Sequence, residues 1–196
     1  MAGFMPVPNS LEKDCWGFLF LTSTLLCHRV RYSDSERKED MATQKEIREF
    51  FFRAMQAGWI STSPTKISFT GMPGYIGFKF RFGSLTLIDC YCVVEGTNRS
   101  FGSTTITEKG KVVWTMQYGG EYPPEAIPIV KLALSEAYRM GQFIGGRGVR
   151  SITYKDYLYV NTEQNGGGDI FFGEEKVIST DSQKVIGFHR YHGMRL

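Results

Sequence analysis

The sequence repeats one pattern, a helix followed by strands, and this repeat constrains the fold more than any other feature. Apolar residues recur at helical spacing over 44–57 and again over 127–140. Each predicted helix is followed by a glycine, Gly58 or Gly141, where a left-handed C-cap residue is expected. The apolar faces are Ile47, Phe50, Phe51, Ala54 and Met55 in the first helix, and Ile127, Val130, Leu134, Ala137 and Tyr138 in the second.

The segments after the two helices also correspond. A long apolar strand is predicted over 85–94, and its counterpart over 154–161. The dipeptides Phe101-Gly102 and Phe172-Gly173 each open a further strand, which a hairpin turn then connects to a returning strand. The hairpin turns are predicted at 108–110 and 180–183.

These patterns predict an α+β fold. Repeat one covers 43–120 and repeat two covers 124–193, each a helix followed by three to four antiparallel strands. One copy cannot easily bury its apolar face alone, so we expect the two to form one compact domain over 43–193. The pattern leaves open whether the repeats share one sheet or form two.

Several motifs resemble a bacterial family of unknown function, DUF5680. They are Phe101-Gly102 followed by Lys111–Gly119, Phe172-Gly173-Glu174-Glu175 with Val177, and Tyr191-His192-Gly193. The resemblance covers about 43–193, and family members occur alone or behind a helix-turn-helix of the Xre type. This chain departs from the family where Gly102-Ser103-Thr104 replaces the first Gly-Glu-Glu. The resemblance implies a fold but no activity, and no DNA-binding role carries over.

Residues 1–42 differ from the rest of the chain. Their apolar run, 16–27, is too short to span a bilayer, and acidic residues precede it, unlike in a secretory signal. A Thr43-x-x-Glu46 capping box begins the first helix directly afterwards. We interpret 1–42 as a poorly ordered extension or as residues before the true start at Met41.

Composition indicates a soluble globular chain. The 196 residues are 42% hydrophobic and carry a net charge of +3 without a basic cluster. Nucleic-acid binding is not predicted, because Arg147, Arg150 and Lys155 are interpreted as a solvated loop edge. The four cysteines form no CxxC pair, which excludes a zinc ribbon, and free thiols favour a cytoplasmic location. No metal site and no cofactor are predicted.

Three residues are weak catalytic candidates: Glu174, Glu175 and His189. Neighbouring strand residues point to opposite faces, so one glutamate could face an apolar cavity, where burial would raise its pKa for acid–base chemistry. The alternative is that one glutamate forms a salt bridge with an arginine or lysine and the other is solvated. His189 and His192 also fall on opposite faces, which disfavours a shared metal ion.

An aromatic stripe supplies the candidate ligand-binding residues. Such a stripe is typical of a core, but it can also line a pocket with a few polar tips. The candidates are Trp114, Met116, Tyr118, Tyr91, Tyr159, Arg190 and His192. The glycine runs 145–148 and 166–168 lack the context of a phosphate loop and are interpreted as flexible turns.

The leading hypothesis is a binding or regulatory module that holds a small molecule or a protein partner between its repeats. The alternative is a hydrolase or isomerase that uses Glu174 or Glu175 as general acid or base. A third reading is a homodimer joined through a sheet edge. The sequence itself does not identify a ligand.

Overall fold

A computed structural model describes residues 41–61, 66–164 and 169–196. Residues 1–40 of the predicted N-terminal extension and the glycine run 166–168 lie outside these residues. Asp40–Leu196 form one compact unit.

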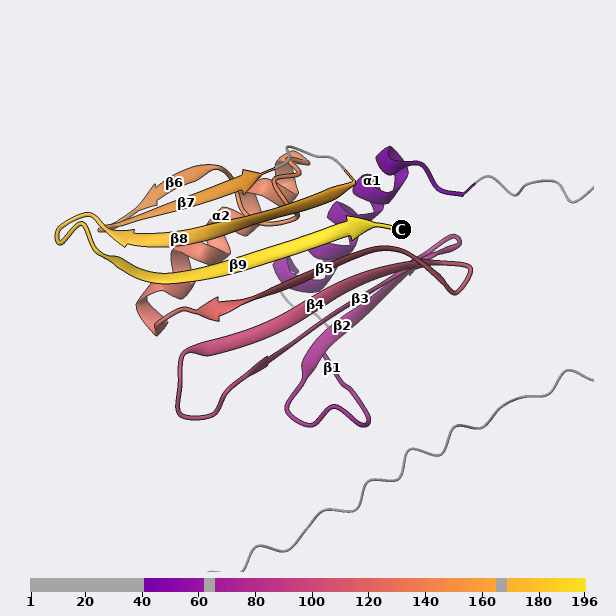
Figure 1. Ribbon diagram of the computed structural model, residues 1–196, viewed down its shortest axis with the longest axis horizontal. Helices are drawn as coiled ribbons and strands as arrows, with labels where there is room; N and C mark the ends of the chain where they lie inside the picture. The colour runs from indigo at the N-terminus through magenta and orange to yellow at the C-terminus, as the bar shows by residue number, and fades with distance from the viewer. Residues whose placement is uncertain (1–40, 62–65, 165–168) are drawn as a thin grey trace, which may run out of the picture. The chain divides into compact units, whose positions relative to one another are not determined.

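All strands belong to one antiparallel sheet with the order β1-β2-β3-β4-β5-β9-β8-β7-β6 (Figure 1). The predicted α+β class is confirmed. At the centre β5 pairs with β9, and Tyr118 lies opposite Tyr191. The strands are β1 (Ile67–Ser68), β2 (Ile76–Phe82), β3 (Leu85–Val93), β4 (Arg99–Glu108), β5 (Lys111–Glu121), β6 (Ser151–Tyr154), β7 (Tyr157–Gln164), β8 (Ile170–Ser179) and β9 (Val185–Arg195).

Helix α1 (Gln44–Met55) begins at the predicted capping box. The Thr43 hydroxyl accepts from the Glu46 backbone N–H, and the Glu46 carboxylate accepts from the Thr43 N–H at 2.8 Å. The helix was expected to reach residue 57, but a π-helical turn (Gln56–Ile60) takes over after Met55. This wider turn brings Trp59 over the sheet, where its ring packs on Phe78.

The predicted role of Gly58 as a left-handed cap is wrong. Gly58 lies buried inside the π-helical turn and is not among the glycines with positive φ. A Cβ atom at this position would lie 2.3 Å from the ring of Phe78. Packing against β2, rather than backbone handedness, therefore explains the glycine.

Helix α2 (Ile127–Met140) has the predicted limits, and Gly141 ends it with a φ of 64°. Both helices lie on one face of the sheet (Figure 1). The core fills the space between them and the strands. Its centre is Phe51, whose ring contacts those of Trp114, Tyr138 and Phe143.

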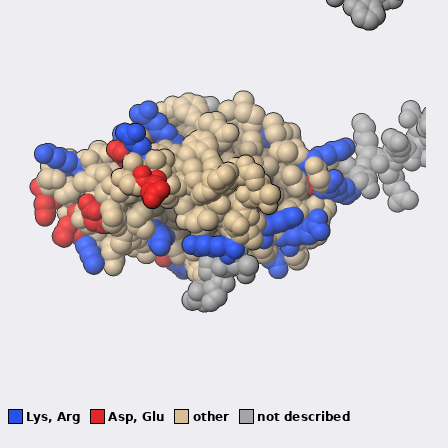
Figure 2. All heavy atoms as spheres, turned by 90° about the horizontal axis from the view of Figure 1, so that it is seen from below, with Lys and Arg blue, Asp and Glu red and all other residues tan. Residues whose placement is uncertain are grey.

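The surface of the fold is described by the distribution of its charged side chains and by the hydropathy of its helices. In the view of Figure 2, Lys and Arg side chains occur at several places around the molecule, while most of the visible Asp and Glu lie toward one end. Among the described residues, no helix combines the length and hydropathy that a membrane crossing requires.

Candidate functional site

A cavity of about 490 Å³ lies between α2, the π-helical turn and the sheet. Its walls are mostly apolar or aromatic, and its polar groups come from four strands, from α2 and from the loops before β4 and after α2. The wall residues include Trp59, Tyr91, Tyr122, Ile127, Val130, Leu134 and Tyr138. The polar residues are Asp89, Ser100, Tyr118, Arg147 and His189, with Thr97, Asn98 and Lys131 also contributing.

Asp89 is fully buried on β3 and receives hydrogen bonds from three side chains. The Thr104 hydroxyl donates to Oδ1, the Trp59 indole N–H donates to Oδ2 at 2.7 Å, and the Tyr118 hydroxyl donates at 3.3 Å. Burial raises the pKa of Asp89 to about 6, although these hydrogen bonds and the nearby Arg147 partly oppose the rise. The carboxyl group therefore titrates close to neutral pH.

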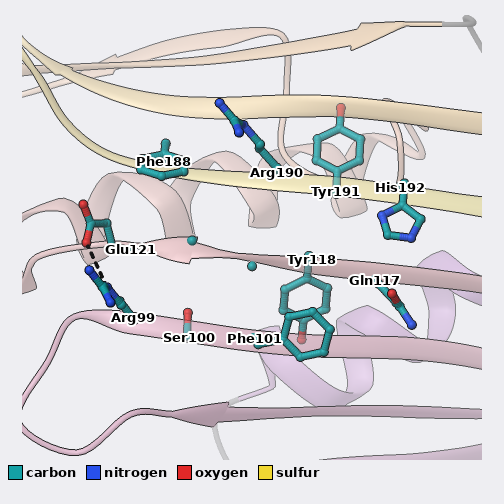
Figure 3. Close-up of a pocket in the computed structure, with 12 residues that line it drawn as sticks. Arg99, Ser100, Phe101, Gln117, Tyr118, Glu121, Phe188, Arg190, Tyr191 and His192 are labelled. Atoms are coloured by element: carbon teal, nitrogen blue, oxygen red, sulfur yellow. Dashed lines mark ion pairs between the residues drawn. The ribbon is translucent and has the colours of Figure 1, made fainter.

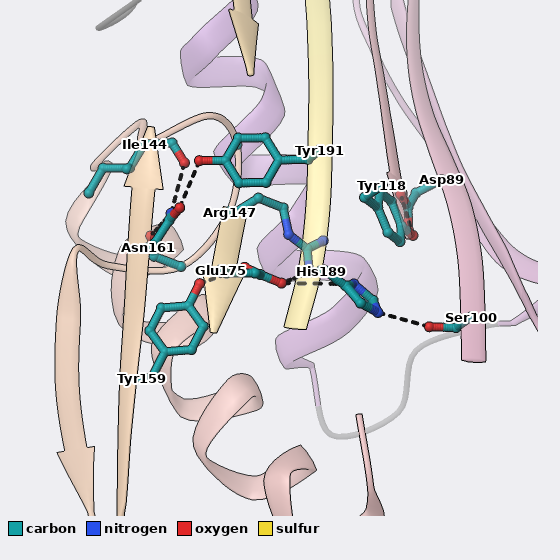
Figure 4. A network of polar contacts seen from close by, with 12 residues as sticks. Asp89, Ser100, Tyr118, Ile144, Arg147, Tyr159, Asn161, Glu175, His189 and Tyr191 are labelled. Carbon is teal, nitrogen blue, oxygen red and sulfur yellow. Dashed lines mark hydrogen bonds and ion pairs between the residues drawn. The ribbon is translucent and has the colours of Figure 1, made fainter. Parts of the chain in front are cut away.

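Arg147 is not on a solvated loop edge, as the sequence suggested. Only 5% of the residue is exposed, and its Nη2 donates to Oε1 of Glu175 at 2.5 Å (Figure 4). Burial alone would lower the pKa of the guanidinium, but the Glu175 carboxylate holds it well above its usual value. The guanidinium carbon lies 4.6 Å from the centre of the Tyr118 ring, a cation–π distance.

The loop that carries Arg147 is packed rather than flexible. Residues 144–149 are all buried. Gly145 has a φ of 59°, and a Cβ there would lie 2.1 Å from the Tyr191 ring. A Cβ at Gly148 would lie 2.5 Å from the Tyr159 hydroxyl oxygen. The glycines let the backbone pass so close to these rings that the arginine side chain enters the interior.

Glu174 and Glu175 fall on opposite faces of β8. Glu175 is fully buried, and the Tyr159 hydroxyl donates to its Oε2 at 2.5 Å. Burial would raise the pKa of Glu175, but Arg147, His189 and the Tyr159 hydroxyl together hold it below its usual value. Glu174 instead pairs with Lys176 at 2.8 Å and with Arg190 at 3.3 Å. Because both glutamates have cationic partners, neither has the setting that an acid with a raised pKa requires.

His189 is 5% exposed, and its ring lies between Ser100 and Glu175. Its Nε2 is 3.0 Å from the Ser100 hydroxyl oxygen, and its Nδ1 is 3.9 Å from Oε1 of Glu175. Burial and the Arg147 charge lower its pKa to about 4, although Glu175 opposes them. The imidazole is therefore neutral at pH 7, and its ring packs 4.4 Å from that of Tyr122.

The ligand-binding candidates from the sequence separate into three places. Tyr91 and Tyr118 line the cavity. Trp114, Met116 and Tyr159 are buried in the core. Arg190 and His192 lie on the sheet face without helices, where a shallow groove of about 540 Å³ also contains Phe101 and Phe188 (Figure 3).

Asp89, Arg147 and Trp59 were missed by the sequence analysis. Asp89 follows Leu85 and Leu87 at alternate positions, so strand periodicity placed a carboxylate on a buried face. Arg147 stands among three glycines within four residues, a composition that permits a tightly packed loop. Both patterns can be seen in the sequence, but neither indicates which residue pairs with the buried Arg147 or which residues donate hydrogen bonds to Asp89.

The fold and the cavity define an α+β protein with a single antiparallel sheet and a pocket that combines apolar walls with a few buried polar groups. A model of one family, Domain of unknown function (DUF5680), matches residues 89–196. The chain belongs to this family, which confirms the resemblance seen in its motifs. The match includes Asp89, Arg147, Glu175 and His189. No curated protein and no solved structure matches the chain.

Proposed function

We propose that this protein binds a small molecule in the cavity between α2 and the sheet. The observation that carries the proposal is the combination of an apolar-walled space of about 490 Å³ with buried Asp89, Arg147 and His189. Small-molecule sites typically enclose about 300–1,000 Å³ and place a few polar groups among apolar walls. Charged residues buried at a cavity are costly for stability, which favours a functional reason for their presence.

The walls favour a ligand with a flat apolar body. Trp59 and Tyr91 have ring centres 5.4 Å apart, and both line the cavity. Tyr122 and Tyr138 add two further rings. Aromatic walls gain most from contact with another ring system or a planar hydrocarbon.

We also infer that the two halves of the chain arose by duplication, which would place the cavity between repeats. Gly102 lies against the Tyr118 ring, and Gly173 lies in the same way against the Tyr191 ring. The Tyr118 hydroxyl donates to Asp89, whereas that of Tyr191 donates to Asn161 at 2.7 Å. The first half supplies Trp59 and Asp89 to the cavity, and the second supplies Arg147 and His189.

Native mass spectrometry of the protein from its own host tests the proposal, followed by thermal-shift screening with the recovered molecule. We expect a copurified small molecule that raises the melting temperature. In Leu134→Trp, an indole would occupy part of the cavity, so binding should fall at least tenfold. Ile170→Trp is the matched control, because Ile170 is 60% exposed and does not line the cavity. Equal binding by both variants would contradict the proposed location, and the same spectra report any homodimer.

Acid–base catalysis by Asp89 is a second candidate function. Unlike the two glutamates, Asp89 has no direct ion pair among the described residues, and its pKa of about 6 is near the pH at which general acids and bases work best. In this case the ligand would be recovered chemically changed. Asp89→Asn should then bind the unchanged molecule without converting it.

A further inference from the structure

Arg147 has fewer hydrogen bonds than a buried guanidinium needs. The group carries five N–H donors. Among the residues that the structure describes, its one hydrogen-bond acceptor is Glu175, and Nε has no acceptor. The Tyr118 ring covers a face of the guanidinium but accepts none of these N–H groups in a conventional hydrogen bond. Because Arg147 lines the cavity and is 95% buried, a molecule in the cavity can supply a further acceptor to the guanidinium.

His189 also has a buried ring nitrogen without a hydrogen-bond partner among the described residues. A lone pair on Nδ1 would face the Glu175 carboxylate at 3.9 Å, so we assign the proton of the neutral imidazole to Nδ1. The Ser100 hydroxyl then donates to Nε2. Within the described part of the chain, Nδ1 has no hydrogen-bond partner. Two neighbouring buried side chains thus both present N–H donors.

The charges of the buried side chains restrict the kind of oxygen acceptor that a ligand can place beside Arg147. At pH 7 Asp89 and Glu175 are both negative, and the guanidinium of Arg147 is the buried positive charge near them. The sum of these three buried charges is negative, and Lys131, which also lines the cavity, is exposed, so solvent and salt screen its charge. An added carboxylate would increase this imbalance in a site of low dielectric, whereas a neutral carbonyl would not.

We propose that the ligand of this cavity carries an uncharged oxygen acceptor, such as a ketone, ester or amide carbonyl, which binds the Arg147 guanidinium. This inference rests on the proposed function and names the polar end of the same ligand. The carbonyl enters the cavity toward Arg147, while the apolar body lies among the aromatic walls. The ligand class is therefore an aromatic or hydrophobic carbonyl compound.

Three probes of matched shape separate the possibilities: 2-acetylnaphthalene, 2-naphthoate and 2-ethylnaphthalene. They share one ring system and differ in having a neutral acceptor, an anionic acceptor or none. Calorimetric titration at pH 7 should rank acetylnaphthalene first, about tenfold tighter than ethylnaphthalene, as expected for one hydrogen bond to a charged donor. Naphthoate should bind more weakly than acetylnaphthalene.

The role of Arg147 is tested by the double variant Arg147→Met with Glu175→Gln, which removes both charges together and so leaves no unpaired ion. It should bind ethylnaphthalene as the wild type does but lose the preference for acetylnaphthalene. If it fails to fold, infrared spectroscopy of the wild type with bound acetylnaphthalene replaces it. A carbonyl stretch below that in hexane supports the proposal, and a hexane-like stretch contradicts it.

The outcomes distinguish this inference from the proposed function. If acetylnaphthalene and ethylnaphthalene bind equally and Leu134→Trp blocks both, the cavity binds ligands but Arg147 does not bind a carbonyl oxygen. The inference is then wrong while the proposed function stands. If naphthoate binds most tightly, the acceptor is anionic and the inference is wrong. If none of the three probes binds, the failure concerns the proposed cavity function.

Discussion

The Arg147 guanidinium and the Glu175 carboxylate form an ion pair that is almost fully enclosed, with side-chain exposures of 6% and 0%. The two residues are 28 positions apart, on a glycine-rich loop and on β8. Each group compensates the charge of the other, and the Tyr159 hydroxyl adds a hydrogen bond to the carboxylate. Arg147 lines the cavity, whereas Glu175 is fully buried in the interior, so the pair joins these two regions.

Glu175→Gln should strongly destabilise the protein, because it leaves the Arg147 charge buried without a counter-ion. Breaking a buried pair from one side costs about 3–5 kcal/mol in the free energy of unfolding. Urea denaturation measures the change. Glu174→Gln is the matched control, since Glu174 pairs at the surface with Lys176 and Arg190 and should cost less than about 1 kcal/mol. Similar losses in both variants would contradict the assigned importance of the pair.

Gly145→Ala should destabilise more than Gly141→Ala. Both glycines have positive φ, of 59° and 64°, so either alanine carries a backbone cost of about 1 kcal/mol. At Gly145 the added Cβ would also lie 2.1 Å from the Tyr191 ring, whereas Gly141 has open space around it. Overpacking adds about 1–3 kcal/mol or more. Thermal unfolding of the two variants gives the comparison, and equal melting temperatures would disprove the close packing of the loop.

The sequence predicts elements that depend on near neighbours. The Thr43–Glu46 capping box and the end of α2 at Gly141 each involve residues within one or two helical turns, so their signals are local. Gly58 shows the limit of such reasoning. Its position after a helical pattern suggested a cap, but its actual contact is Phe78, which lies 20 residues further along the chain.

The site was harder to predict than the fold, because charge burial is decided by distant partners. Arg147 looked like a surface residue until Glu175 and the Tyr118 ring were placed beside it. Tyr118 and Arg190 belong to the same predicted set of ligand-binding residues. Tyr118 lines the cavity, whereas Arg190 lies in the groove on the opposite face of the sheet. Residue types gave the candidates, but only the register of β5 with β9 separates the two faces.

Asp89 and His189 should give opposing contributions to the pH dependence of stability. The pKa of Asp89 rises from 3.8 to about 6 on folding, so the native state holds an extra proton between these values, and this contribution falls as pH rises. The pKa of His189 falls from 6.5 to about 4, so the unfolded state holds the extra proton and this contribution grows as pH rises. Between pH 4 and 6 the two effects largely cancel.

His189→Phe should therefore uncover the Asp89 contribution. Relative to wild type, its free energy of unfolding should fall by about 2–3 kcal/mol as pH rises from 4 to 6.5. Asp89→Asn should show the opposite slope, because it leaves the His189 contribution alone. Urea denaturation at several pH values measures both, with His192→Phe on the exposed face as the control. Parallel profiles for His189→Phe and wild type would contradict the shifted titrations.

The indole N–H of Trp59 should report the titration of Asp89 directly. It donates to Oδ2 at 2.7 Å, and protonation of the carboxyl group weakens that hydrogen bond. In nuclear magnetic resonance spectra of nitrogen-15-labelled protein, the Trp59 indole signal should shift with a midpoint near pH 6. The Trp114 signal should stay constant over the same range, and Trp59→Phe and Trp114→Phe assign the two signals. In Asp89→Asn the shift of the Trp59 signal should disappear.

The same titration bears on the ligand. Below its midpoint Asp89 loses its negative charge, so the buried charges of Arg147 and Glu175 balance and the penalty for an anion decreases. Affinity for 2-naphthoate should therefore approach that for 2-acetylnaphthalene at pH 5, whereas affinity for 2-ethylnaphthalene should not change. A Trp59 signal that does not move between pH 4.5 and 7.5 would mean that Asp89 keeps one charge state, and the discrimination between the two oxygen probes should then be independent of pH.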